Sequence, residues 1–319
     1  MRTISLVLVV ASMACYREAA SPPSLSAPVA NKVSPRPEPR ASQDVLAYLP
    51  IDSELVVRID FKAVRASAMW EHFRPKIYDA IGAVLAMMRE RCGFDPVESI
   101  ASVALAMRSI QDRDAVAVIR GLDRDAYLAC VASVRDSGGR VSVANDDGMF
   151  TFTGLSGHTL WGRFADRSTL VIHTSSQARA DSLRAVLRGG AALRRSPAFL
   201  AMFDHLAQDV ALWFVVDPEG SWFRTHAGAG PRMRGIYGSF AVDAIATLAI
   251  HVVIDDAAQA SQLAAAVDQQ LKQARPLFDK LTATSDGDMI SVECQMSPAQ
   301  VDRILGMTGA MFKSAHTKP

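Results

Sequence analysis

Cys15 is the residue whose position most directly implies a chemical reaction. It follows a basic residue, Arg2, a short apolar run, Ile4 to Ala11, and the small or flexible residues Ser12-Met13-Ala14. This order is typical of an export signal, and a cysteine at this point suggests a lipid anchor. The predicted chemistry is acylation of the Cys15 thiol, with cleavage of the chain in front of it.

Two ways of processing this N-terminus remain open. The apolar run is only about half of the ~20 residues that a transmembrane helix needs, so we expect its removal. Ser12 and Ala14 fit the ordinary signal-peptidase pattern, which would release a soluble, secreted protein that begins at Cys15. The segment also resembles a lipobox, although Ser12 stands where Leu is typical. We expect the lipoprotein, bound to a membrane of the cell envelope through Cys15, with the secreted form as the alternative.

The three other cysteines are Cys92, Cys130 and Cys294. An exported protein meets an oxidising compartment, where thiols pair. Cys92 ends one predicted helix and Cys130 lies on the apolar face of the next, so a Cys92–Cys130 disulfide is the preferred pairing. Three buried free thiols are the alternative. Cys294 alternates in phase with Ile290 and Val292 and is predicted to lie in the core as a small apolar residue.

No metal, cofactor or catalytic residue is predicted from the remaining motifs. The chain has seven histidines, none with zinc spacing, and it has no paired Cys-x-x-Cys and no regular acidic calcium loop. His173 and His251 fall on predicted strands, opposite the apolar faces, where surface or hydrogen-bonded histidines are expected. Ser156 lies in Gly154–His158, which lacks the Gly-x-Ser-x-Gly spacing of a nucleophile elbow and is interpreted as a hairpin turn.

A loop rich in glycine and arginine, residues 224–235, is the best candidate for a binding site. Its glycines free backbone N–H groups, and Arg224, Arg232 and Arg234 could together hold an anion. The loop lacks the lysine and the following Ser or Thr of a phosphate-binding P-loop. The alternative is an ordinary connection between two strands.

Charge and composition exclude some partners and suggest the layout of the N-terminal region. The chain has 34 basic and 33 acidic side chains, and this neutrality argues against binding to nucleic acid. Residues 15–43 are rich in Pro, Ser and Ala and favour an extended tether of about 3 Å per residue. The predicted segments are an export signal at 1–14, this tether, a first α+β half at 44–190, a second at 191–313 and a tail at 314–319.

Hydrophobic periodicity in the body alternates between strands and helices. Apolar residues at every second position predict strands, for example at 54–61 and 209–217, and the spacing of Tyr127, Cys130, Val131 and Val134 predicts a helix capped by Asp123. Short connections between successive strands favour mainly antiparallel sheets with helices packed on one face, an α+β fold. The two halves share an order of elements, which suggests a duplicated α+β unit; a chance similarity of two α+β segments is the alternative.

Part of the body resembles a known class of proteins. The segments Tyr48-Leu49-Pro50, Glu54–Val57, Arg65–Trp70 and Cys92–Pro96, followed by Cys130, resemble uncharacterised exported lipoproteins of Gram-negative bacteria. The resemblance covers about 90 residues. It implies an exported α+β body without assigned chemistry, and it implies no functional residues.

The function expected from the sequence is that of a non-enzymatic, envelope-anchored lipoprotein. Its α+β body would be presented to a protein or to another envelope component. The alternative is a carrier that holds an apolar ligand or a lipid in a cleft between a sheet and its helices. A cavity above ~300 Å³ would favour the carrier, and converging titratable groups with strongly shifted pKa values would favour an enzyme.

Overall fold

The computed structural model describes the body of the chain and leaves both ends outside. The described residues are 44–304 except 111, 137–140, 144–147, 154–158, 176–177, 190 and 222–231. The export signal, the tether and Cys15 therefore lie outside the described residues. So do Ser156, Arg224 and most of the arginine-rich loop.

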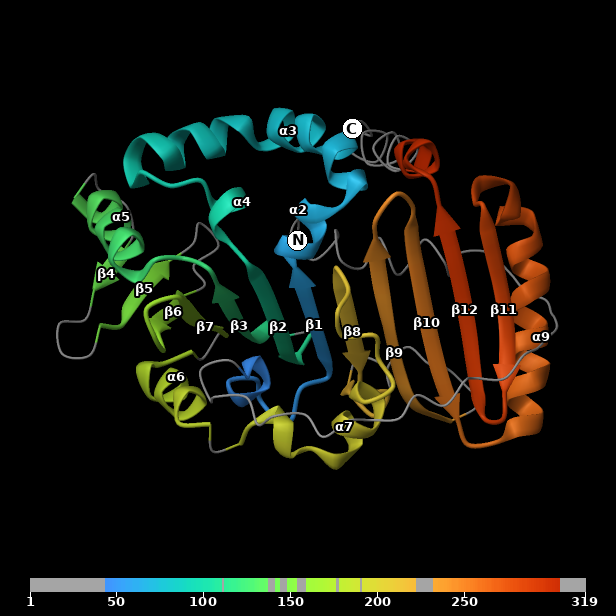
Figure 1. The fold of residues 1–319 in the computed structure, drawn as a ribbon. Helices are drawn as coiled ribbons and strands as arrows, with labels where there is room; N and C mark the ends of the chain where they lie inside the picture. Colours follow the sequence, from blue (N-terminus) through green and yellow to red (C-terminus); the bar gives the residue numbers. More distant parts are fainter. Residues whose placement is uncertain are drawn as a thin grey trace, which may run out of the picture.

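In this part of the chain, twelve strands form one sheet in which all neighbours are antiparallel (Figure 1). The order across the sheet is β11-β12-β10-β9-β8-β1-β2-β3-β7-β6-β5-β4. The strands are β1 (Leu55–Asp60), β2 (Ser102–Ser109), β3 (Asp114–Arg120), β4 (Val141–Val143), β5 (Phe150–Thr153), β6 (Thr159–Phe164), β7 (Thr169–Thr174), β8 (Leu212–Val216), β9 (Met233–Val242), β10 (Ala246–Ile254), β11 (Lys280–Asp286) and β12 (Met289–Met296).

Helices connect the strands and pack against the sheet or along its edge. They are η1 (Val45–Ala47), α2 (Phe61–Ala66), α3 (Ala68–Cys92), α4 (Pro96–Ser99), α5 (Arg124–Asp136), α6 (Ala180–Leu187), η2 (Leu193–Arg195), α7 (Pro197–Phe203), α9 (Ala257–Ala274) and η3 (Arg275–Leu277). Two of the caps predicted from the sequence are present. The Ser67 hydroxyl accepts from Trp70 N–H at the start of α3, and Asp123 accepts from Ala126 N–H at the start of α5.

The α+β expectation is confirmed, but the helices cover both faces of the sheet. Strand β7 shows the arrangement, because successive side chains point to opposite faces. Leu170 packs in one cluster with Val131 of α5, whereas Val171 packs in another with Leu183 of α6. Both strand residues are fully buried. The expectation of one covered face came from the short connections between strands, whereas β7 buries side chains on both of its sides.

The C-terminal end of the sheet is covered by α9. Leu271 of α9 packs with Leu281 of β11 and with Cys294 of β12. Cys294 is a buried free thiol, as its alternation with Val292 predicted. Burial raises the pKa of this thiol to about 12, so it stays protonated and unreactive at neutral pH.

The two halves of the sheet repeat one order of connections. In the first half, the meander β1-β2-β3 is followed by α5 and by further strands, the last of which, β7, pairs with β3. In the second half, the meander β8-β9-β10 is followed by α9 and a hairpin whose last strand, β12, pairs with β10. The halves meet where β1 pairs antiparallel with β8. This shared order is what the hypothesis of a duplicated α+β unit expects.

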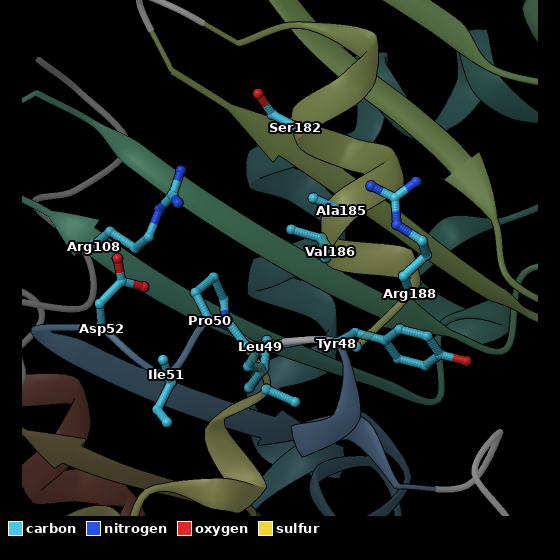
Figure 2. A pocket seen from close by; sticks show the side chains of 13 residues that line it. Tyr48, Leu49, Pro50, Ile51, Asp52, Arg108, Ser182, Ala185, Val186 and Arg188 are labelled. Atoms are coloured by element: carbon cyan, nitrogen blue, oxygen red, sulfur yellow. The ribbon is translucent and has the colours of Figure 1, made fainter.

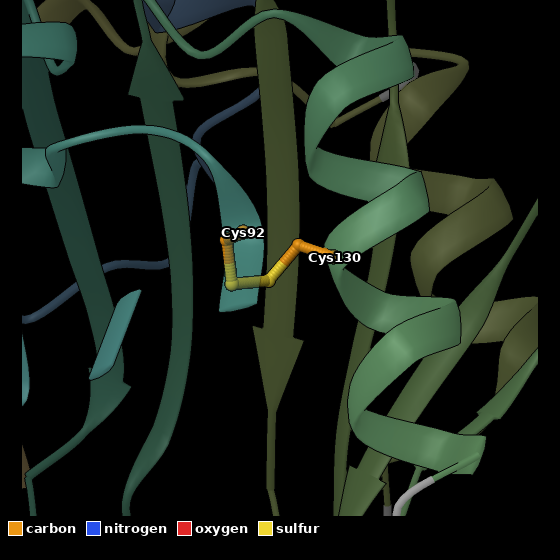
Figure 3. The surroundings of a disulfide bond; sticks show 2 residues. All are labelled: Cys92 and Cys130. Carbon is orange, nitrogen blue, oxygen red and sulfur yellow. A yellow bond between two sulfur atoms is a disulfide. The ribbon is translucent and has the colours of Figure 1, made fainter. Parts of the chain in front are cut away.

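A disulfide joins α3 to α5 (Figure 3). It connects Cys92, the last residue of α3, with Cys130 in the middle of α5, and it is the pairing expected from the sequence. Helix α3 runs along one end of the sheet strands (Figure 1). The bridge therefore fixes the far end of this long helix to a helix that packs on the sheet.

Candidate functional site

A cavity of about 600 Å³ lies between α6, the end of β2 and the segment Tyr48–Asp52 (Figure 2). We call it the α6 pocket. Its lining residues are Tyr48, Leu49, Pro50, Ile51, Asp52, Arg108, Ser182, Ala185, Val186, Arg188, Gly189, Ala191 and Ala192. Most of these side chains are apolar, and the charged ones lie at the two ends of the pocket (Figure 2).

Backbone hydrogen bonds hold the pocket wall formed by Tyr48–Asp52. Ile51 N–H donates to the Ala191 carbonyl at 2.9 Å, and Leu193 N–H donates to the Leu49 carbonyl at 2.7 Å. The Leu49 side chain is buried in the main core cluster, which anchors the segment from beneath. The wall is therefore tied both to the core and to the stretch that follows α6.

Arg108, which lines the pocket at the end of β2, belongs to a charged cluster on β2, β3 and β7. The Arg108 guanidinium forms an ion pair with the Asp114 carboxylate at 2.8 Å, and its Nη2 lies 3.3 Å from His173 Nε2. His173 Nε2 also lies 3.1 Å from Asp114 Oδ1. Three side chains from three neighbouring strands thus fix one another, and Arg108 is held at the pocket by the other two.

His173 lies on the buried side of β7, which corrects the sequence expectation that it lies opposite the apolar face. The residue is 1 % exposed, and α6 packs on this side of the strand. Its Nδ1 atom is buried without a hydrogen-bond partner among the described residues. Burial lowers the pKa of His173 more than the Asp114 carboxylate raises it, so the imidazole is neutral at neutral pH.

Arg188 marks the other end of the α6 pocket. It is the C-cap residue of α6 and its guanidinium points away from Tyr48, whereas Asp52 lies next to Arg108 (Figure 2). No described residue forms an ion pair with Arg188, in contrast to Arg108 and Asp114. The pocket therefore combines an apolar floor with one neutralised and one uncompensated arginine.

The arginines predicted to bind an anion lie elsewhere, on and before β9. Arg232 forms an ion pair with Glu219 at 2.8 Å. Arg234 forms an ion pair with Asp255 at 3.2 Å, and its Nη2 also donates to the Ile254 carbonyl at 3.1 Å. Arg224 lies outside the described residues. The anion site proposed for this loop stays a prediction, with two of its three arginines already paired with acidic side chains.

The histidine pairs of the described region do not form a catalytic constellation. His251 Nδ1 lies 2.9 Å from the Ser291 hydroxyl, but no described carboxylate is hydrogen-bonded to the ring. His173 has a carboxylate partner but no hydrogen-bonded Ser, Thr or Cys nucleophile among the described residues. A nucleophile needs both a base and a group that orients that base. Nor do the described residues contain a group of three or more side chains that could hold a metal ion.

Sequence reasoning missed the α6 pocket and its arginines. Of its lining, only Tyr48-Leu49-Pro50 belongs to a segment with a sequence signal, the resemblance to exported lipoproteins. Arg108 and Arg188 each follow an apolar run and give no motif of their own. The pocket exists only because three distant segments of the chain meet at it.

Comparison with known proteins identifies a solved structure with a similar fold. No protein-family model matches the sequence, and no curated protein matches it. Among solved structures, crystal form IV of TP0453, a membrane-associated lipoprotein of Treponema pallidum, superposes with a TM-score of 0.53 at 8 % identity, over 82 % of this chain and 96 % of that one. The chain shares the fold of TP0453. Crystal form III superposes with a TM-score of 0.49 at 10 % identity, over 83 % of this chain and 99 % of that one. Crystal form I superposes with a TM-score of 0.49 at 10 % identity, over 82 % of this chain and 96 % of that one.

Among the described residues, no helix combines the length and the apolar character that crossing a membrane would require.

Proposed function

We propose that this chain is a lipid-anchored protein of the cell envelope that presents its α+β body to a partner without catalysing a reaction. The observation that carries the proposal is Cys15 directly after an export signal, followed by a Pro-rich tether. The fold shared with a bacterial lipoprotein supports it.

The anchor is tested by the mass of the mature protein extracted from membranes. The wild type should have a mature N-terminus at Cys15 and carry the added mass of two or three acyl chains. The Cys15→Ala variant should lack that mass and leave the membrane fraction. A full-length, uncleaved wild-type chain in the cytoplasm would contradict the proposal.

The presentation of the body is tested by crosslinking in intact cells. The anchored wild type should give a specific crosslinked envelope protein, and the same body released by Cys15→Ala should give much less of it. If the wild type gives no more crosslinked species than a sample without crosslinker, this part of the proposal is contradicted.

A second function is favoured by the α6 pocket. Its volume of about 600 Å³ lies in the range of small-molecule sites, and its floor is apolar. These properties support a carrier of a ligand with an apolar part, bound between a helix and the sheet. Binding of a soluble apolar probe, measured by calorimetry, tests it, and replacing Val186 by Gln at the pocket floor should weaken that binding.

A further inference from the structure

We propose that the α6 pocket binds an amphipathic anion, an apolar chain that carries a carboxylate or phosphate, with the anionic group at Arg188. The inference rests on the second proposed function and adds the chemical class of the ligand. Arg188 and the apolar floor of the pocket carry it.

The first step concerns the apolar part of the ligand. Leu49, Pro50, Ala185 and Val186 lie between the two charged ends of the pocket (Figure 2). These side chains offer no hydrogen-bonding groups, so they favour a ligand segment that has none either. A chain of methylene groups gains about 0.8 kcal/mol per CH₂ that leaves water.

The second step concerns the charge. The positive charge of Arg108 is balanced by the Asp114 carboxylate at 2.8 Å, and Asp52 lies on the same side of the pocket. No described acidic residue forms an ion pair with Arg188. The Arg188 end of the pocket is therefore the end where an anion gains most and where no described carboxylate lining the pocket repels it.

The third step concerns hydrogen bonds to the anionic group. A guanidinium offers several N–H donors in one plane, which match the oxygens of a carboxylate or phosphate. Arg188 is exposed at its end of the pocket and forms no ion pair with a described residue, so its donors are available to a ligand.

The test uses the purified full chain carrying Cys15→Ala, so that no anchor contributes, and dodecanoate below its micelle concentration as the probe. Calorimetry compares dodecanoate with uncharged dodecanol and with inorganic phosphate. Dodecanoate should bind most tightly, and Arg188→Gln should weaken it about fivefold while leaving dodecanol unaffected. Arg188 is exposed, so this variant leaves the core intact. Arg184 on the same helix pairs with Asp181 and does not line the pocket, so Arg184→Gln should change nothing.

The outcomes separate this inference from the function on which it rests. Equal binding of dodecanoate and dodecanol, unchanged by Arg188→Gln, overturns the anion and leaves the carrier standing. Binding of neither probe overturns both. Vesicles of anionic and of zwitterionic phospholipid, added together with dodecanoate, identify the source. Arg188-dependent competition by the anionic vesicles assigns the anion to a lipid headgroup, and its absence assigns it to a free amphipathic anion.

Discussion

The carboxylate of Asp268 on α9 accepts a hydrogen bond at 3.2 Å from the backbone N–H of Ala283. Ala283 lies on β11, the strand at the edge of the sheet. Arg275 binds the same carboxylate and donates to the Leu281 carbonyl at 3.0 Å. Two backbone groups of β11 are thus satisfied by side chains in place of a neighbouring strand. This arrangement removes part of the pairing surface that makes an exposed sheet edge prone to association.

Replacing Asp268 by Ala should lower the free energy of unfolding by about 1–3 kcal/mol, because the Ala283 N–H is then left buried without an acceptor. Asp268 itself is only 5 % exposed, so water does not readily replace it. Urea unfolding measures the loss, and sedimentation velocity measures self-association through the uncovered edge. The control is Glu293→Gln, which breaks an exposed ion pair with Lys280 and should cost less than ~1 kcal/mol. Equal stability of the two variants would contradict the role of Asp268.

Removing the disulfide with the double change Cys92→Ala and Cys130→Ala should lower the free energy of unfolding by about 3–4 kcal/mol. The two residues are 38 apart in sequence, and the bridge restricts the unfolded chain over this loop. Chemical unfolding with and without reductant measures the effect: reductant should destabilise the parent protein and leave the double variant unchanged. With Cys15 replaced, the unreduced, denatured parent should have one reactive thiol, that of Cys294. A count of three thiols would show that the bridge is absent.

The free energy of unfolding should fall as the pH drops below about 6.5, the ordinary pKa of a histidine side chain. His173 and His251 both have pKa values lowered by burial, the second also by the nearby His205. Above this pH both histidines are neutral in the folded and in the unfolded chain, so they contribute no pH dependence. Below it the unfolded chain binds protons first, so stability is lost until the folded histidines are protonated too.

Urea unfolding at pH 7.5, 6.5 and 5.5 measures this dependence. His173→Gln and His251→Gln should each flatten the fall in stability between pH 6.5 and 5.5, whatever they do to the absolute value. The double variant should flatten it most. A fall that is as steep in the double variant as in the parent would assign the acid sensitivity to other groups.

Gly121→Ala, in the connection directly after β3, should be a costly small change. Gly121 has a φ of +103°, and a Cβ atom there would lie 2.3 Å from the Ser99 carbonyl oxygen and 2.5 Å from the Ala101 nitrogen. Both neighbours are backbone atoms, so the connection after β3 would have to move. Gly287 provides the control, since its φ is +55° and nothing lies within 4 Å of the added atom.

Gly287→Ala should cost about 1–2 kcal/mol, the price of left-handed backbone alone. Gly121→Ala should cost a further ~1–3 kcal/mol for the steric overlap. Thermal unfolding of the two variants side by side measures the difference. Equal midpoints would mean that the chain around Ser99 and Ala101 adjusts without cost.

The sequence by itself determined the features that depend on neighbouring residues. The order of charge, apolar run and cysteine at Cys15 predicts export and anchoring, a prediction that lies outside the described residues. Alternation of apolar residues identified the strands, and capping residues such as Ser67 and Asp123 identified helix starts. Local hydrogen bonds and side-chain periodicity set these features, so they can be read without knowing the fold.

Tertiary structure alone decided which faces are buried and where the pocket lies. The sequence leaves open whether His173 is a surface or a hydrogen-bonded residue, and the fold buries it because α6 covers its side of β7 as α5 covers the other. The α6 pocket joins residues 48–52, 108 and 182–192. Periodicity tells which side chains share a face of a strand or helix, whereas the partner that covers that face comes from distant parts of the chain. For this reason the sequence predicted the elements and the cysteine pairing but gave no signal for the α6 pocket.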